Sequence, residues 1–244
     1  MGKKIVLLGY GRMGKEVEDI ALERGHEILL RIKRDNAEDL NPENLKSADV
    51  AIDFSLPEAA PDLIQTCLEN KVPVVSGTTG WLSKKSLIED YCKEKGSAFL
   101  YASNFSIGVN VFFALNKFLA ETMKDLEDYS VKMAEVHHTG KKDAPSGTAI
   151  SLAHEIIQEN SRYSGWNLGT DPMPSSIPIE AIREAGVPGT HEVEYQSEID
   201  SIKIIHQAHN RKGFALGAVM AAEFIIGKAG LFDMNDVIQI QKNA

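Results

Sequence analysis

Nearly continuous apolar runs recur along the first hundred residues, and the stretches between them carry apolar residues at helical spacing. Val17, Ile20 and Ala21 show that spacing after the first run. Strands that are apolar along their whole length are typical of a parallel sheet buried under helices on both faces. The pattern therefore predicts an α/β fold with a Rossmann-like parallel sheet. Its expected strands are residues 5–8, 27–32, 49–54, 72–76 and 98–102.

The second half of the chain has a different pattern, with shorter runs in which apolar and polar residues alternate in part. Residues 130–136, 179–183, 192–195 and 201–205 are expected to be strands of a mixed sheet in an α+β domain. An exposed face of such a sheet is a natural oligomer interface. The glycines, serines and prolines of residues 163–178 predict a long irregular connection. Residues 215–226 are expected to form a helix packed in a core.

Composition excludes several classes of protein. The chain has 244 residues, 43% of them hydrophobic and 25% charged, which is ordinary for a globular protein. A formal net charge of -9 argues against general nucleic-acid binding, which needs a concentrated basic surface. The first apolar run is too short for a signal peptide or a membrane span. Only Cys67 and Cys92 are present, which favours a reducing, cytoplasmic compartment and no cysteine-based metal site.

A glycine motif directly follows the first predicted strand and opens a predicted helix. Gly9, Gly11 and Gly14 match G-x-G-x-x-G, in which the glycines permit a tight turn, close approach of a pyrophosphate and close helix packing. Gly14-Lys15 also matches the end of a nucleoside-triphosphatase phosphate loop. That loop requires Ser or Thr next, and Glu16 stands there instead. The motif therefore predicts a dinucleotide cofactor.

The choice between the two nicotinamide cofactors depends on the end of the second strand. Lys33 and Arg34 follow that strand, and Asp35 comes next. Two cations suit the 2′-phosphate of NADPH, and Arg12 could add a third contact. If Lys33 and Arg34 only solvate a loop, Asp35 could hold the ribose of NADH. NADPH is favoured, and NADH remains possible.

Polar clusters follow two later strands, at the sheet edge where parallel sheets bind their ligands. Residues 77–80 follow one strand and residues 103–106 follow the next. Their hydroxyls, carboxamide and glycine backbone could fix a nicotinamide and its ribose. Each cluster alone is only turn chemistry.

The segment 135–149 gathers proton donors, cations and a helix start. His137 and His138 end a predicted strand and point to opposite faces, and Lys141 follows within one loop. Residues 146–148 lie at or next to a helix N-terminus, where free amide N–H groups favour an anion. A turn, a helix cap and a solvated basic face would explain each residue separately. Their conjunction favours a site for a small anion beside a proton donor.

The chain resembles the 4-hydroxy-tetrahydrodipicolinate reductases, also called dihydrodipicolinate reductases. The signature of that family matches residues 135–138 and 141–149. The resemblance spans nearly the whole length. The other matching stretches are the Gly9 loop and residues 51–55, 77–80, 104–110, 217–219 and 230–234.

The resemblance implies a reaction: an NAD(P)H-dependent reductase delivers a hydride to C4 of a cyclic imine dicarboxylate, with loss of the 4-hydroxyl as water. It implies a dinucleotide-binding domain over residues 1–106, a substrate-binding and homotetramer-forming domain over 107–209, and a segment 210–244 that returns to the first domain. His137 and Lys141 are the implied proton donors, and His138, Gly147 and Thr148 the implied substrate ligands. The implied cofactor ligands are Gly9, Tyr10, Gly11, Arg12, Met13, Gly14, Gly77, Thr78, Thr79, Ala102, Ser103, Asn104 and Phe105.

The chain departs from the family pattern in three places. The glycine loop is one residue shorter than in many members. Lys33 replaces a usual acidic residue, and Thr139-Gly140 replaces bulkier, often basic residues before Lys141. None of these changes touches the implied proton donors or carboxylate ligands.

Other interpretations remain for comparison. A regulator that only senses NADPH would have no need for His137, Lys141 and the 147–148 cradle together, and another small-carboxylate dehydrogenase should show a catalytic Cys or a lone Lys-Asp pair. Arg211 is a candidate for a hinge or a nicotinamide-side contact. The spacing of His191, His206 and His209 fits no structural zinc pattern, so no metal is expected.

Overall fold

The computed structural model describes residues 2–210 and 212–239. The chain divides into two compact units, residues 1–107 with 212–244 and residues 108–211. The sequence predicted divisions after residues 106 and 209. Arg211, the predicted hinge or nicotinamide contact, lies outside the described residues.

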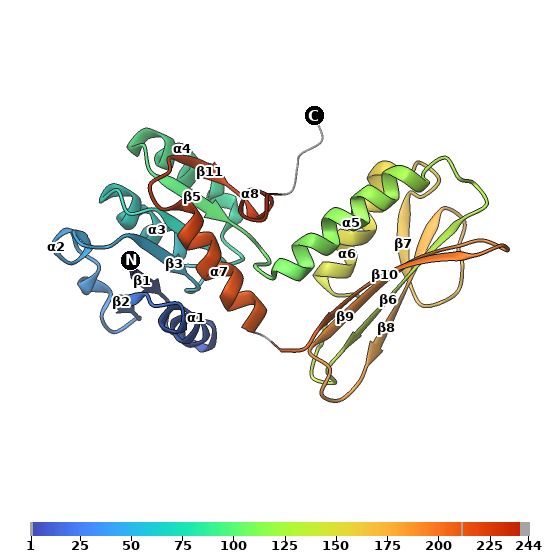
Figure 1. Cartoon of the computed structure of the whole chain (residues 1–244), viewed down its shortest axis with the longest axis horizontal. Coiled ribbons are helices and arrows are strands. Elements are labelled where there is room, and N and C mark those ends of the chain that lie inside the picture. The colour runs from blue at the N-terminus through green and yellow to red at the C-terminus, as the bar shows by residue number, and fades with distance from the viewer. Residues whose placement is uncertain (1, 211, 240–244) are drawn as a thin grey trace. The chain divides into compact units, whose positions relative to one another are not determined.

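The first unit is built on a six-stranded sheet in which every strand pair is parallel, as the apolar runs predicted (Figure 1). The strand order is β11-β5-β4-β3-β1-β2. Because β2 lies on one side of β1 and β3 on the other, the order changes direction at β1, where such sheets bind ligands. The strands are β1 (Lys4–Leu8), β2 (Glu27–Ile32), β3 (Val50–Asp53), β4 (Val74–Ser76), β5 (Ala98–Tyr101) and β11 (Gly230–Phe232).

Helices cover both faces of this parallel sheet. Ile5 and Leu7 of β1 belong to the core formed with α1 and α7, whereas Val6 and Leu8 belong to the core formed with α2, α3 and α4. Burial on both faces explains why these strands are apolar throughout. The helices are α1 (Arg12–Glu23), α2 (Pro42–Leu45), α3 (Ala60–Glu69), α4 (Lys85–Lys95), α7 (Lys212–Ile225) and α8 (Met234–Val237), with short 3-10 turns at Ala37–Asp39 and Leu82–Lys84.

The second unit contains a five-stranded mixed sheet in the order β10-β9-β6-β8-β7. β6 pairs parallel with β8 and antiparallel with β9, so the predicted mixed sheet is confirmed. The elements are α5 (Ile107–Met123), β6 (Ser130–His137), α6 (Gly147–Glu159), β7 (Gly165–Leu168), β8 (Ser176–Arg183), β9 (Gly189–Gln196) and β10 (Ser201–Ala208).

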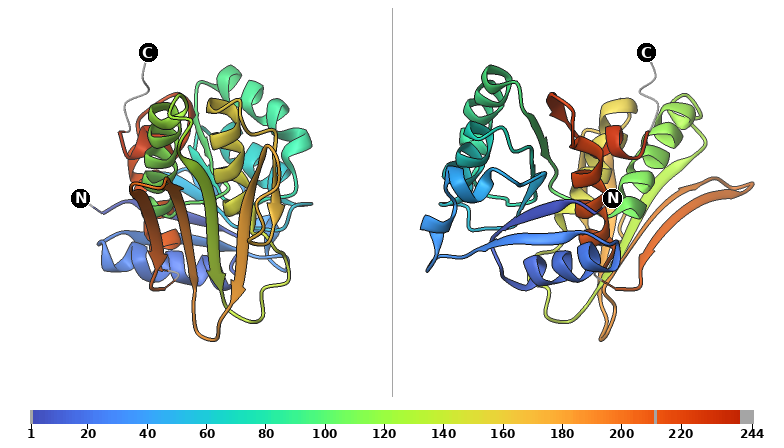
Figure 2. Two further views of the ribbon diagram at one scale, coloured as in Figure 1. Left: turned by 90° about the vertical axis from the view of Figure 1, so that its right-hand side faces the viewer. Right: turned by 60° about the vertical axis from the view of Figure 1, so that its left-hand side comes forward.

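Helices α5 and α6 cover one face of the mixed sheet. Alternate residues of its strands, such as Met133 and Val193, pack against Phe112 of α5 and Leu152 of α6. The left panel of Figure 2 looks onto the other face, which carries no helix of this unit in the described part of the chain. That face displays ion pairs of Lys203 with Glu192 and Glu194, together with the exposed Ile182 and Ile205.

Two sequence expectations need correction. Residues 163–178 are not wholly irregular, because β7 forms there and pairs parallel with β8. Its residues are partly buried or exposed at the sheet edge, so the sequence has no apolar run there that would predict a strand. The three residues of β11 were not predicted as a strand, since so short an element has no period to detect. No helix among the described residues is both long enough and apolar enough to span a membrane.

Candidate functional site

The glycine loop joins β1 to α1 at the point where the strand order changes direction. Gly9 has a φ of +87°, and a Cβ atom there would lie 2.4 Å from the carbonyl oxygen of Phe54. A Cβ on Gly14 would lie 2.4 Å from the carbonyl oxygen of Gly9, so the helix start packs directly on the loop. Gly11 caps α1, and a Cβ there would contact no atom within 4 Å. The loop thus leaves open space at a helix N-terminus.

Arg12 and Met13 occupy the first turn of α1. Arg12 is exposed, whereas Met13 is half-buried and packs against the core of the first unit. Met13 therefore contributes to the packing of the helix, whereas Arg12 places its charge in the solvent.

An ion pair that the sequence did not predict lies beside the glycine loop. Arg31 of β2 donates to both carboxylate oxygens of the buried Glu18, and the Tyr10 hydroxyl donates to the same carboxylate. The hydrogen bond from Arg31 is the main cause that holds the pKa of Glu18 below its usual range. Glu18 neutralises Arg31 in this way. At the end of β2 the positive charge that Glu18 does not neutralise is therefore that of Lys33 and Arg34, both exposed in the turn that follows. The Lys33 Nζ atom lies 5.3 Å from the centroid of the Tyr10 ring.

The cluster after β4 is built around two aromatic rings. A Cβ on Gly77 would lie 2.2 Å from the Phe54 ring and 2.9 Å from the Phe105 ring, and these rings meet edge to face. Glycine is therefore required at 77 by packing, in addition to any contact with a ligand. The Thr78 side chain is buried, while Thr79 is exposed.

The cluster after β5 continues the same edge of the parallel sheet. Ala102 is half-buried and packs on the core, and Ser103 is exposed. The side chain of Asn104 accepts a hydrogen bond from the Ser106 backbone N–H at 2.9 Å. Phe105 is buried, and its carbonyl oxygen would lie 1.7 Å from a Cβ on Gly217, so α7 packs directly against this turn. The predicted cofactor residues thus all follow the carboxyl ends of β1, β2, β4 and β5 in the first unit.

The predicted proton donor His137 ends β6 on the face that packs against the helices. Its residue is 8% exposed, and its Nδ1 lies 3.7 Å from Oε2 of the fully buried Glu135. Glu135 and His137 share this face because strand side chains alternate. Burial lowers the pKa of His137, and the Glu135 charge opposes that shift.

The predicted second donor, Lys141, lies in the loop between β6 and α6. Its Nζ binds both carboxylate oxygens of Asp143 at 2.8 and 2.9 Å, and this pairing holds the pKa of Asp143 low. The backbone N–H of Lys141 donates to the carbonyl of His138, which is half-buried at the start of the loop.

Helix α6 begins where the sequence predicted. Ser146 is its N-cap, and its hydroxyl accepts a hydrogen bond from the Ala149 backbone N–H. Gly147 is exposed, and a Cβ there would meet no atom within 4 Å. Thr148 is half-buried beside it. The first turn of α6 therefore presents accessible backbone N–H groups, as an anion cradle requires.

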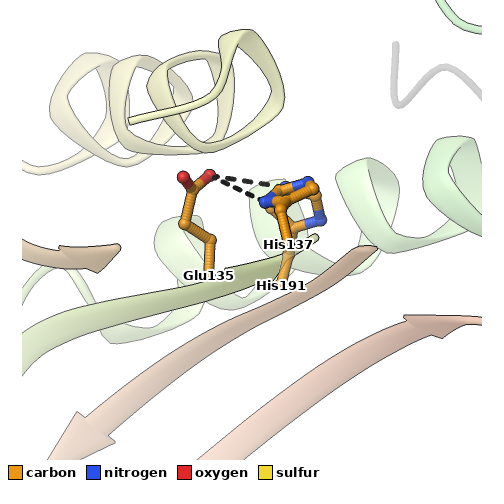
Figure 3. Close-up of side chains that lie close together, drawn as sticks. All are labelled: Glu135, His137 and His191. Carbon is orange, nitrogen blue, oxygen red and sulfur yellow. Dashed lines mark ion pairs between the residues drawn. The ribbon is translucent and has the colours of Figure 1, made fainter. Parts of the chain in front are cut away.

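His191 joins this group from the neighbouring strand, and the sequence reasoning considered it only as a metal ligand. It is the cross-strand partner of Glu135 (Figure 3). Its Nε2 lies 3.1 Å from the Ser146 hydroxyl. Its ring meets the His137 ring edge to face at 5.0 Å between centroids. Burial, assisted by the adjacent His137, lowers the pKa of His191 to about 4.

The ligand atoms of Glu135, His137 and His191 lie within 4.8 Å of one another, a spacing that could hold a cation. Arg183 also binds the Glu135 carboxylate, and Lys141 lies close enough to lower the pKa of His137. These two cations oppose a third positive charge at this cluster. His206 and His209, the other histidines considered as ligands, do not belong to it.

Strand periodicity could have singled out Glu135, since it stands two residues before His137. His191 and Arg183 could not be found in that way. They reach the site through the registers of β9 and β8, where Glu135 pairs with His191 and His137 pairs with Arg183. A local run of residues does not specify which residues of two strands pair.

Family models match both parts of the chain. The model described as "Dihydrodipicolinate reductase, N-terminus" matches residues 3–105, and "Dihydrodipicolinate reductase, C-terminus" matches residues 108–238. Together they include every residue of the candidate site.

Curated relatives and a solved structure agree with these models. A 4-hydroxy-tetrahydrodipicolinate reductase of Christiangramia forsetii is 53% identical over 96% of this chain and 97% of its own length. One from Alkaliphilus oremlandii is 38% identical over 79% of this chain and 80% of its own length. A dipicolinate-bound dihydrodipicolinate reductase of Paenisporosarcina sp. TG-14 has the same fold, with a TM-score of 0.80, 22% identity, and coverage of 98% of this chain and 100% of that one.

Proposed function

The chain belongs to the dihydrodipicolinate reductase family, and from this premise we propose that it reduces 4-hydroxy-tetrahydrodipicolinate to tetrahydrodipicolinate with NADPH. This reaction belongs to the diaminopimelate and lysine pathway. The observation that carries the proposal is the buried His137 beside the open N-terminus of α6, a proton donor next to an anion cradle.

The substrate is a cyclic imine with two carboxylates. Loss of its 4-hydroxyl as water gives an unsaturated imine, and a bound nicotinamide supplies the hydride that adds to C4. The addition leaves an enamine, which must take a proton on carbon to give the product. The protein therefore has to hold two carboxylates and deliver one proton.

His137 is suited to deliver that proton, because it is buried at the end of β6 and the nearby charge of Glu135 supports its protonated form. Lys141 is the second candidate. Its ammonium group is paired with the exposed Asp143, so it must leave that partner, or share it, in order to reach a substrate. A positioned acid of this kind contributes about 10²–10⁴-fold in rate.

The first turn of α6 is suited to hold a carboxylate of the substrate. The backbone N–H groups at Gly147 and Thr148 are accessible, and the positive end of the helix dipole favours the negative charge. His138 adds an imidazole at the start of the same loop. The chemistry needs no metal, and we propose that none takes part.

The glycine loop fits a dinucleotide, since the open space at Gly11 lies at the N-terminus of α1. Family membership supports the use of NAD(P)H. We propose a preference for NADPH, because Arg31 is already neutralised by Glu18 and the exposed Lys33 and Arg34 remain for a 2′-phosphate.

The uncovered face of the mixed sheet, with exposed Ile182 and Ile205, supports a homotetramer formed through the second unit. The two cysteines are both free and buried, which suits a cytoplasmic enzyme.

A coupled assay tests the reaction. Purified protein should oxidise NADPH, followed by the loss of absorbance at 340 nm, only when supplied with the condensation product of pyruvate and aspartate semialdehyde. It should oxidise NADPH faster than NADH. His137→Gln should lower kcat by about 100-fold or more with a smaller change in KM. Full turnover by His137→Gln would disprove the acid assignment, and a clear NADH preference would disprove the assignment of Lys33 and Arg34.

A further inference from the structure

Glu135 contacts four other residues of the site. It is 0% exposed. Oε2 accepts a hydrogen bond from the Ser146 backbone N–H at 2.9 Å, and Oε1 accepts one from Arg183 at 3.2 Å. The same carboxylate lies 3.7 Å from His137 Nδ1 and 3.9 Å from His191 Nε2 (Figure 3).

These contacts connect the two ends of the loop between β6 and α6. Glu135 lies near the end of β6, and the Ser146 N–H that it binds is the first donor of the α6 cap. Arg183 also donates to the carbonyl of Asp143 at 2.6 Å, in the middle of the loop. One carboxylate with its arginine thus anchors the loop that carries Lys141 and leads into the anion cradle.

The imidazole of His137 has an unsatisfied atom on the Glu135 side. Its Nδ1 is buried and has no hydrogen-bond partner, and Glu135 offers the nearest carboxylate oxygen. A movement of less than 1 Å would turn the 3.7 Å contact into a hydrogen bond. That bond would fix the Nδ1–H tautomer and leave Nε2 for the substrate.

The charges around His137 do not all act in the same direction. Burial, Lys141 and Arg183 lower its pKa, while Glu135 and Asp143 raise it. His191, packed against its ring from β9, is itself buried with a lowered pKa. Asp143 is exposed, so Glu135 is the buried carboxylate that supports a protonated His137.

We propose that Glu135 is a positioning residue, which orients and charges His137 through Nδ1 and holds the first turn of α6 through the Ser146 N–H. The proposal rests on the proposed function, because the proton donor and the carboxylate cradle belong to that reaction. A single buried carboxylate then sets the relative placement of both.

The alternative is a purely structural ion pair of Glu135 with Arg183. Removal of the carboxylate would then lower stability without selective effects on the proton donor. Two substitutions separate the possibilities. Glu135→Gln keeps an oxygen that can accept from Ser146 but removes the charge, whereas Glu135→Ala removes both.

The first measurement needs no substrate. The imidazole of His137 is titrated by NMR in histidine-labelled protein, with His137→Gln used to assign its signal. The pKa of His137 should fall in Glu135→Gln, since the charge that opposes burial is lost. Glu155→Gln is the control, because Glu155 is a half-buried carboxylate of the same unit that accepts a hydrogen bond from Asn116 at 3.0 Å, away from the site.

The second measurement is steady-state turnover as a function of pH. Glu135→Gln should lower kcat at pH 7 by about 10-fold or more with KM changed less than about 3-fold. Its rate should also decline at lower pH than that of the wild type. Glu135→Ala should add an increase in KM and weaker binding of pyridine-2,6-dicarboxylate by calorimetry, because the α6 cap loses its anchor. Glu135→Asp, which keeps the charge, should recover part of kcat.

Each result has a definite meaning. An unchanged His137 pKa in Glu135→Gln, or equal kcat losses in Glu135→Gln and Glu155→Gln, would overturn the proposal. If Glu135→Gln does not fold, the same comparison is made between the wild type and Glu135→Ala, which also lacks the charge, and an unaltered titration there overturns it equally. If the wild type itself fails to turn over the substrate, the proposed function fails, while the NMR titration still decides whether Glu135 controls His137.

Discussion

At the scale of single residues, the backbone of a neighbouring strand packs closely against the His137 ring. A Cβ on Gly189 of β9 would lie 3.2 Å from His137 Nε2 and 3.3 Å from Cδ2. The imidazole thus stands between Glu135 on its Nδ1 side and the bare backbone of Gly189 on its Nε2 side. In the proposed mechanism Nε2 is the atom that transfers the proton, and the absence of a side chain at 189 leaves room for it.

Gly189→Ala should therefore impair catalysis more than folding. The added methyl group would displace the imidazole by a few tenths of an ångström, and we expect kcat to fall about 10-fold with a stability cost of about 1 kcal/mol. Gly165→Ala is the control, because a Cβ at 165 meets no atom within 4 Å. Equal kcat values for the two variants would contradict the prediction.

His191 should make stability depend on pH. Its pKa is about 4 in the folded state, below its ordinary value near 6.5, so the unfolded chain binds more protons between these values. The contribution of this residue to the free energy of unfolding should be fully present above pH 6.5. It should decrease as the pH falls towards 4, by on the order of 3 kcal/mol. Urea unfolding across this range should show a shallower decrease for His191→Gln than for the wild type. The exposed His154→Gln should keep the wild-type slope; a common slope for all three proteins would refute the assignment.

At the scale of elements, the N-terminus of α6 combines a closed inner side and an open outer side. Ser146 is buried and bound by both Glu135 and His191, while Gly147, the next residue, is exposed. The cap is therefore held from within the unit, and its outward N–H groups remain available. Anion binding at this turn needs no rearrangement of the helix.

Gly147→Ala should separate binding from stability. No atom lies within 4 Å of the new methyl group, and alanine loses less backbone entropy than glycine, so the melting temperature should be unchanged or slightly higher. The methyl group should obstruct the substrate carboxylate and raise KM by about 10-fold, the equivalent of one charged hydrogen bond. Ser151→Ala, at an exposed position of the same helix, should leave KM unchanged. A wild-type KM in Gly147→Ala would remove this turn from the substrate site.

The sequence predicted elements well where one period dominates. The five apolar strands of the first unit and the helix start after Pro145 follow from patterns that burial on both faces and a Ser cap explain. β7 and β11 were missed because short or edge strands carry no such pattern. The contacts of Glu135 with Arg183 and His191 depend on strand register, and the role of Gly77 depends on where the rings of Phe54 and Phe105 pack. Such information lies in tertiary structure and not in a local run of residues.

At the scale of the whole molecule, the face of the mixed sheet without helices is the surface that we propose for assembly. Ile205 is 56% exposed, and it pairs across the strands with Glu192, which points away from the helices. The ion pairs around it, Lys203 with Glu192 and Glu194, satisfy charges that would otherwise resist burial. The face can therefore be covered by another copy of the chain at a low electrostatic cost.

Ile205→Glu should consequently weaken the proposed tetramer. An unpaired carboxylate placed in that surface must be desolvated on association, so light scattering should show a mass below four chains. Leu126→Glu changes a residue of similar exposure outside the sheet and should keep the tetramer mass. A tetramer that persists in Ile205→Glu at micromolar concentration would place the interface elsewhere.

The return of α7 and β11 to the first unit has a consequence for synthesis of the chain. Ala218, Val219 and Ala222 of α7 form part of the core beneath β1 and β3, and β11 extends the sheet beside β5. The strands before residue 108 therefore emerge from the ribosome with one apolar face covered only in part, by α1. The second unit is continuous in sequence and can complete its fold while the first waits. Throughout that interval the nascent first unit is exposed to aggregation, and chaperones have their longest opportunity to bind it.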